Sequence, residues 1–166
     1  MTDEELANRA LELLSGTPYF NVATTSGGEP WNSPVWVARD DDLNLYWSSW
    51  TRAVHSCNIE MNPRVFLTVY DSTRKRGTNN MRCLYLRCTA NSVQDPAEAR
   101  KAFALLYPDE VINLEDFLGA GQKRFYRARP LQAWLNCLSE RDLTPATIKM
   151  RVEIPLKMIS ASPQSS

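Results

Sequence analysis

The chain has 166 residues, with 19 basic and 19 acidic side chains and therefore no formal net charge at pH 7. A chain of this size is typical of one ordinary domain with a sizeable core, so we expect residues 1–166 to form a single domain. The balanced charge lacks the broad attraction of proteins that bind nucleic acid or anionic membranes, and neither is expected as a partner.

The first 16 residues predict an amphipathic helix. Thr2 followed by Glu5 is a capping-box pattern. Four apolar residues before Gly16 fall on one face of such a helix: Leu6, Ala10, Leu13 and Leu14. The segment begins acidic and lacks the basic start and continuous apolar run of a signal peptide, which favours a protein without a secretion signal.

Three β-rich runs follow, separated by the turns SGGE and DDD. They are YFNVATT at 19–25, PWNSPVWVAR at 30–39 and LNLYWSS at 43–49, and they predict a three-stranded antiparallel meander. Residues 35–37 and 45–47 are apolar at every position. A second subunit is the simplest cover for the second apolar face, although a small-molecule site would also use it.

The middle of the chain predicts one short helix and two strands. The helix covers about 53–61 and ends at an Asn-Pro pair, because the residue before a proline is pushed out of helical geometry. RVFLTVYD at 64–71 reads as a buried strand, and MRCLYLRCTANSV at 81–93 reads as a long one. The polar loop 71–80 between them carries three cations.

Two further helices are expected after these strands. Asp95 can cap a helix over 95–106, with Pro96 at its first position and an apolar stripe along one side. Residues 108–121 predict a second short helix that ends in GAG.

The last elements complete a mainly β (α+β) chain. Strands are expected at 124–140 and 146–159, and residues 160–166 are expected to form a flexible tail. About seven strands, two to four peripheral helices and short antiparallel connections predict a closed or nearly closed antiparallel β-barrel with helices at its openings.

The cysteines predict a reducing compartment. They stand at positions 57, 83, 88 and 137, without the C-x-x-C pair of a zinc ribbon or a thioredoxin motif. No apolar stretch reaches the length of a membrane span. With a single histidine and scattered thiols, no metal site is predicted, and we expect a cytoplasmic protein.

Four stretches carry a resemblance to a known family. They are NSPVWV at 32–37, LYWSS at 45–49, HSCNIEMNPRV at 55–65 and VYDSTRKRG at 69–77. In order and spacing they resemble the split β-barrel of the pyridoxamine 5'-phosphate oxidase-like flavoproteins, over about residues 17–93 and more loosely to the C-terminal strands. The pattern is similar to a branch of that family other than the true oxidases.

The resemblance implies a homodimer with two equivalent sites at the subunit interface, each holding FMN. In relatives, the strand matching 33–38 runs beside the flavin ring, and the segment matching 48–55 binds the ribityl chain and phosphate. Pro34, Val35 and Trp36 could then form a wall for the ring. Ser48 and Ser49 could bond the ribityl chain, and the helix start at 53 offers free N–H groups to the phosphate.

The same resemblance singles out further binding candidates. His55 would be protonated beside a phosphate and serve as a cation, or else it is a capping or surface histidine. Asn58 lies one helical turn later and could bind the cofactor or cap the helix. Ser72 begins the polar loop, and Trp134 lies in the strand that reaches the partner's flavin in relatives.

This chain departs from the true oxidases at the phosphate. Ser33, Ala38, Val54 and His55 stand where relatives have Arg, Lys, Arg and Lys. Arg52 could compensate in part, as could the cations at 74–76. No residue is identified as a catalytic acid or base, and the substrate is unassigned. The alternatives to an FMN-dependent oxidoreductase are a non-enzymatic binding module with a repurposed or empty pocket and a deazaflavin-dependent reductase.

Overall fold

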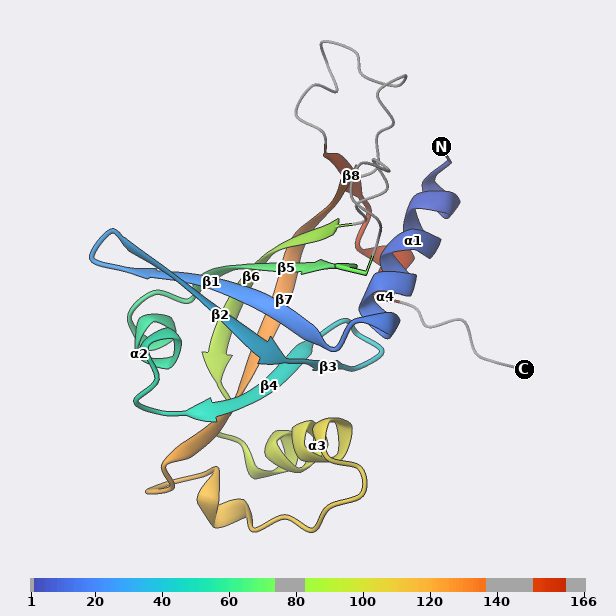
Figure 1. Cartoon of the computed structure of the whole chain (residues 1–166). Helices are drawn as coiled ribbons and strands as arrows, with labels where there is room; N and C mark the ends of the chain where they lie inside the picture. The colour runs from blue at the N-terminus through green and yellow to red at the C-terminus, as the bar shows by residue number, and fades with distance from the viewer. Residues whose placement is uncertain (1, 74–82, 137–150, 161–166) are drawn as a thin grey trace.

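The computed structural model describes residues 2–73, 83–136 and 151–160. The strands are β1 (Tyr19–Ser26), β2 (Glu29–Trp36), β3 (Ala38–Arg39), β4 (Leu45–Trp50), β5 (Arg64–Tyr70), β6 (Cys83–Ser92), β7 (Lys123–Asn136) and β8 (Val152–Ile154). The helices are α1 (Asp3–Gly16), α2 (Val54–Met61), α3 (Pro96–Leu106), the 3-10 turn η1 (Leu114–Asp116) and α4 (Lys157–Ser160). The strands form one curled antiparallel sheet with helices around it (Figure 1).

The sheet closes on itself through a bend at Val37. Its strands follow the order β2-β1-β5-β6-β7-β4-β3, and β8 pairs with β7. The two strands at the ends of this order, β2 and β3, are separated in the chain only by Val37, whose N–H donates to the Pro18 carbonyl at 2.8 Å. The predicted mainly β split barrel is confirmed.

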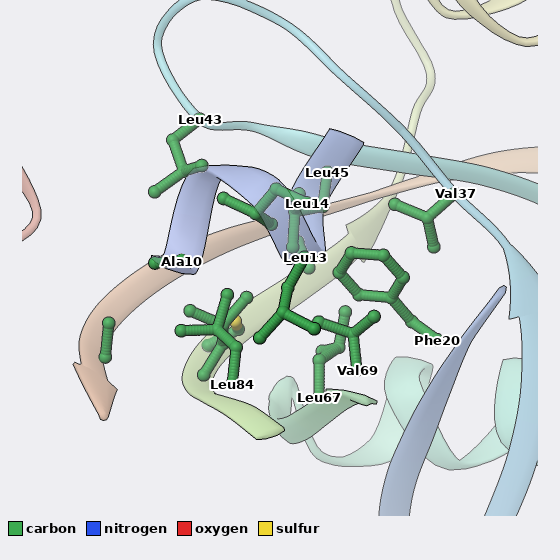
Figure 2. Packing of buried hydrophobic residues seen from close by; sticks show 14 of the residues in the cluster. Ala10, Leu13, Leu14, Phe20, Val37, Leu43, Leu45, Leu67, Val69 and Leu84 are labelled. Carbon is green, nitrogen blue, oxygen red and sulfur yellow. The ribbon is translucent and has the colours of Figure 1, made fainter. Parts of the chain in front are cut away.

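Helices cover both ends of the barrel. Figure 2 shows side chains of α1 meeting side chains of β1, β4, β5 and β6 at one end: Ala10, Leu13, Leu14, Phe20, Leu45, Leu67, Val69 and Leu84. Helix α4 packs beside α1 there, whereas α2 packs on β1, β2 and β6 at the opposite end (Figure 1). Full burial of one such large apolar side chain stabilises the fold by about 1.5–3 kcal/mol.

The two long helices begin at the residues that the sequence predicts. The Thr2 hydroxyl accepts from the Glu5 N–H, and the Glu5 carboxylate accepts in return from the Thr2 N–H, which completes the capping box of α1. Asp95 caps α3 by accepting from the Glu98 N–H at 2.8 Å. Such caps depend only on residues close in sequence, so the sequence reveals them.

Helix α3 covers the outer face of β4. Tyr46 points to this side and joins a second apolar cluster with Phe103 and Phe125, whereas Leu45 and Trp47 point into the barrel. The second apolar face of 45–47 is therefore covered by the same chain. The corresponding outer residue of 35–37, Trp36, has 51% of its surface exposed and packs edge-on against Tyr19.

The predicted meander is correct in its first pairing and only in part in its second. Strands β1 and β2 do pair as a hairpin, but the expected strand 30–39 breaks at Val37. Only Ala38 and Arg39 continue to pair with β4, and the other neighbour of β4 is β7. The bend is needed because a barrel of this size must redirect its edge strand to close.

The predicted helix over 108–121 is also wrong. Only the three residues of η1 are helical, in a turn that the Asn113 side chain caps by accepting from the Glu115 N–H at 3.3 Å. Gly119 adopts a positive φ of 52°, and a Cβ at Gly121 would collide with the backbone carbonyl of Asp116. The glycines therefore shape a tight loop, which a helix could not follow.

The last predicted strand, 146–159, is correct only in part. Val152–Ile154 form β8, and Pro155 ends it because proline cannot donate to the ladder. Residues 157–160 form α4 instead of extending the strand. The earlier part of this segment, the end of the expected strand 124–140 and most of the expected tail lie outside the described residues.

A polar network ties α3 to the turn before β4. Asp40 is buried, with 7% of its surface exposed. Its carboxylate accepts hydrogen bonds from the Asn44 backbone N–H, the Asn44 side-chain amide and the Lys101 ammonium, at 2.8, 2.9 and 2.6 Å. Leu43 in the same turn adopts a φ of 63°, which these bonds help to hold. Burial alone would raise the pKa of Asp40, but the bonds from Lys101 and Asn44 outweigh it and lower the pKa.

Replacing Asp40 by alanine should lower the free energy of unfolding by about 2 kcal/mol, because it leaves Asn44 and Lys101 without their acceptor. The folded pKa lies below the ordinary 3.8, so the contribution is complete above about pH 5 and is lost as the pH falls through the folded pKa. Urea denaturation of the Asp40 variant at pH 7 and pH 3 measures this, with Asp42→Asn as the exposed control. The same loss of unfolding free energy at pH 7 and at pH 3 would contradict this explanation.

Candidate functional site

The N-terminus of α2 is an uncapped helix end. Its N-cap residue, Ala53, makes no side-chain hydrogen bond. The N–H groups of Val54, His55 and Ser56 lie in the first turn, where helix geometry supplies no acceptor, and the helix dipole makes this end positive. Arg52 is exposed just before the helix. Together these groups can receive an anion such as a phosphate.

A chain of hydrogen bonds joins α2 to the edge strand β2. The Nδ1 atom of His55 lies 3.1 Å from the Ser33 hydroxyl, and the Trp31 indole N–H donates to that hydroxyl at 3.0 Å. The Ser33 hydroxyl has one proton to donate and a second lone pair, so it can either donate to His55 Nδ1 or accept from it. In the tautomer in which Ser33 donates, the imidazole proton lies on Nε2, and His55 presents an N–H donor there.

The Nε2 atom of His55 has no partner in the part of the chain that the structure describes. Only 8% of the His55 surface is exposed, so solvent does not replace the missing partner fully. A buried donor without an acceptor costs about 1–3 kcal/mol. An anion that reached Nε2 would remove this cost, and the uncapped helix start with the exposed Arg52 fits a phosphate group.

Burial lowers the pKa of His55 below its ordinary value of 6.5. The imidazole is therefore mainly neutral near pH 7 when no anion is bound, whereas the protonated state expected from the sequence is that of His55 beside a phosphate. Arg52 then supplies the permanent positive charge at the helix start, and His55 supplies a neutral hydrogen-bond donor.

The predicted wall of Pro34, Val35 and Trp36 is divided between two faces of β2. Val35 points into the barrel and is 7% exposed, as strand alternation requires. Pro34 and Trp36 point outward, where they pair across to Asn21 and Tyr19 of β1. A flat ring could therefore contact Pro34 and Trp36 through side chains, and Val35 only through its backbone.

Ser48 and Ser49 also point to opposite faces. The Ser48 hydroxyl lies 2.6 Å from the Tyr107 hydroxyl, on the α3 side of β4. Ser49 shares the Trp47 face of the strand, on the barrel side, and is half-buried. Of the two serines, Ser49 is the one on the same side as α2.

Asn58 fixes α2 to the barrel. Its amide donates to the Thr24 hydroxyl of β1 at 3.0 Å, and both residues are buried. This bond holds the helix in the position from which His55 reaches Ser33. Asn58 thus lies one helical turn after the uncapped start of α2, on the side that packs against β1.

Ser72 and Trp134 lie apart from the His55 group. Ser33 is in register with Val22 and Leu67, whereas Ser72 lies in the turn after the end of β5, beside a cavity at the end of α1. Trp134 lies on the outer face of β7, stacked on Phe66 at 6.3 Å. The cations at 74–76 lie outside the described residues.

Two side-chain contacts were not predicted from the sequence, one in the His55 group and one on the other side of β4. The contact of Trp31 with Ser33 could have been found, because the two residues alternate on one face of β2. Tyr107 carries no such signal, since its contact with Ser48 spans 59 positions in the chain.

Two kinds of feature were not found in the described residues, a metal-binding cluster and a membrane-spanning helix. No group of three or more His, Cys, Asp or Glu side chains within them could hold a metal ion. None of the helices in the described ranges is long and apolar enough to cross a membrane.

A family model for pyridoxamine 5'-phosphate oxidase matches residues 6–137 of this chain. No curated protein sequence matches it.

The fold is similar to those of several solved structures. A heme binding protein from Mycobacterium smegmatis has 15% identity and a TM-score of 0.69, covering 93% of this chain and 59% of that protein. General Stress Protein 26 from Bacillus anthracis has 14% identity and a TM-score of 0.57, and the match covers 79% of this chain and 93% of that protein. A FAD-binding protein from Mesorhizobium loti has 19% identity and a TM-score of 0.57, and the match covers 74% of this chain and 87% of that protein. At these identities the likeness is one of fold.

Proposed function

This chain belongs to the pyridoxamine 5'-phosphate oxidase family, and on that premise we propose that it binds FMN and acts as an oxidoreductase on a small molecule. The observation that carries the proposal is the unpartnered Nε2 of buried His55 at the uncapped start of α2. A protein of similar fold from Mesorhizobium loti is described as FAD-binding, which supports a flavin as the ligand.

Different residues of the chain would bind the phosphate, the ribityl chain and the ring of FMN. Arg52, the first N–H groups of α2 and His55 Nε2–H would hold the phosphate, and Ser49 would bond the ribityl chain. Ser33 would keep His55 in the tautomer that donates from Nε2. Pro34 and Trp36 would contact the ring on the outer face of the edge strand β2, opposite to the face that carries Ser33. Neutral donors and one arginine thus stand where the true oxidases carry several basic residues. We therefore expect weaker phosphate binding than a fully cationic site gives.

When bound, the flavin supplies the electron-transfer chemistry, and the protein positions it and excludes competing reactions. Asn58 and Thr24 hold α2 against β1, and Trp31 orients the Ser33 hydroxyl. We assign no general acid or base to the described residues of the site, because neutral His55 is engaged in binding.

We further propose a homodimer in which each site lies at the subunit interface. Aromatic side chains gather on the outer face of the sheet, where Trp36 and Tyr19 are 51% and 58% exposed. Phe66, Trp134 and Tyr85 lie together on the same sheet, with the Arg87 guanidinium 5.5 Å from the Trp134 ring centre. Exposed aromatic groups with arginine are typical of protein interfaces. Sedimentation velocity should give twice the mass of the chain, and a monomer would contradict the dimer.

A cytoplasmic location accords with the thiols. Cys57, Cys83 and Cys88 are free cysteines among the described residues.

Two other functions are separated from this one by direct tests. Parallel titrations with FMN and with a deazaflavin distinguish the two cofactors. Anaerobic addition of NADH or NADPH to the FMN-loaded protein should bleach the flavin absorbance if the protein is an oxidoreductase. Bound flavin that dithionite bleaches but neither nicotinamide reduces would favour a binding module over a nicotinamide-dependent oxidoreductase.

A further inference from the structure

A second cavity lies on the other side of β4 from the His55 group. Its volume is about 460 Å³, and its lining residues come from the end of β4, the C-terminus of α3, the loop through η1 and the start of β7. Figure 1 shows these segments at one end of the molecule. This volume lies within the range of pockets that hold small molecules. Of the groups proposed to hold FMN, Ser49 also lines this cavity, whereas none of the phosphate-binding groups at the start of α2 does.

Two aromatic rings of this cavity already hold an ammonium group. The Lys123 Nζ atom lies 5.2 Å from the ring centre of Trp50 and 5.8 Å from that of Phe117. Both distances are within the range of cation–π attraction. Phe117 is fixed in place because it stacks on buried Phe125 at 4.3 Å with an angle of 8° between the rings. The walls of the cavity are thus arranged for a cation before any ligand arrives.

The polar groups of the cavity also favour a cation over an anion. Glu110 and Asp116 line it with two carboxylates, against the one ammonium of Lys123. The Ser48 and Tyr107 hydroxyls, 2.6 Å apart, offer hydrogen bonds at the β4 side. The remaining lining includes the Phe103 ring, which packs on Tyr107 at 5.3 Å.

We infer that this cavity binds a small organic cation, with a quaternary ammonium or a positively charged aromatic ring seated between Trp50 and Phe117. The Lys123 ammonium marks the position of the ligand's charge and must move aside for it. Aromatic cages of this kind recognise such cations because the ring faces are negative and desolvation of the ligand is cheap. The inference does not depend on flavin binding.

Isothermal titration of the full chain with benzyltrimethylammonium tests the inference, with benzyl alcohol and benzoate as the neutral and anionic probes of similar shape. The cation should bind at least about threefold more tightly than either. Trp50→Leu and Asp116→Asn should each weaken it about threefold or more, whereas Glu115→Gln, on the same turn but outside the cavity, should not. Lys123→Met should strengthen it, because the competing ammonium is gone.

Each other outcome overturns the inference. Equal affinity for the three probes, or no binding, removes the cation site. Preferred binding of benzoate that Lys123→Met abolishes would make the cavity an anion site instead. All these variants change exposed or half-buried side chains, and far-ultraviolet circular dichroism checks that each is folded. The same titration with FMN present separates the two sites, because failure of flavin binding leaves the expected result unchanged.

Discussion

Replacing Arg52 by alanine should weaken FMN binding by about tenfold or more, which corresponds to the roughly 1.5–3 kcal/mol of one charge-assisted hydrogen bond. Arg52 is the exposed cation at the start of α2, and the phosphate would lose its permanent positive partner. Fluorescence titration of FMN measures the change. Arg100→Ala, an exposed arginine on α3, is the control that should leave the affinity unchanged.

Three His55 variants separate the two nitrogen atoms of the ring. His55→Ala should weaken FMN binding to a similar degree, because it removes the Nε2 donor. Glutamine carries its amide nitrogen near the position of Nε2, and asparagine carries its own near Nδ1, where Ser33 lies. His55→Gln should therefore retain more affinity than His55→Asn. The reverse order would mean that the Ser33 contact, and not the Nε2 donor, supports the phosphate.

Trp47→Ala should lower the free energy of unfolding by about 3–5 kcal/mol, because it opens a large cavity in the barrel core. Trp47 is fully buried and stacks on Tyr126 at 5.7 Å with an angle of 18°. Urea denaturation followed by circular dichroism measures the loss.

Trp47→Phe provides the matched variant. The Trp47 indole N–H has no hydrogen-bond partner among the described residues, so phenylalanine keeps the stacking and removes an unsatisfied donor. Its cost should stay below about 1.5 kcal/mol. A phenylalanine variant as unstable as the alanine variant would show that the indole N–H is satisfied in solution, by water or by a ligand.

The parts of the fold that depend on neighbouring residues were predictable from the sequence. Thr2 and Glu5 lie within one helical turn, and so do Asp95 and Glu98, so the starts of α1 and α3 could be located directly. The loop after α3 could not, because Phe117 is held by stacking on Phe125 from β7 and Gly121 by contact with the backbone of η1. Such tertiary contacts outweigh local helix propensity.

The sequence named Ser33, Arg52 and His55 as candidates but did not reveal how they are arranged, and it grouped them with Ser72 and Trp134, which lie apart. Ser33 and His55 stand 22 positions apart, and only the pairing of α2 with β2 brings them to 3.1 Å. The neutral state of His55 follows from its burial, which the sequence does not reveal. Alternation along β2 and β4 separates Val35 from Trp36, and Ser48 from Ser49. A prediction that groups consecutive strand residues into one binding surface overlooks that they point to opposite faces of the sheet.

The absorption spectrum of the protein after incubation with FMN and removal of free ligand tests the central claim most directly. We expect retained flavin bands, one FMN per chain, and a loss of both in the double variant Arg52→Ala/His55→Ala. A colourless protein with no quenching of FMN fluorescence, or a haem spectrum in the protein as purified, would contradict the claim.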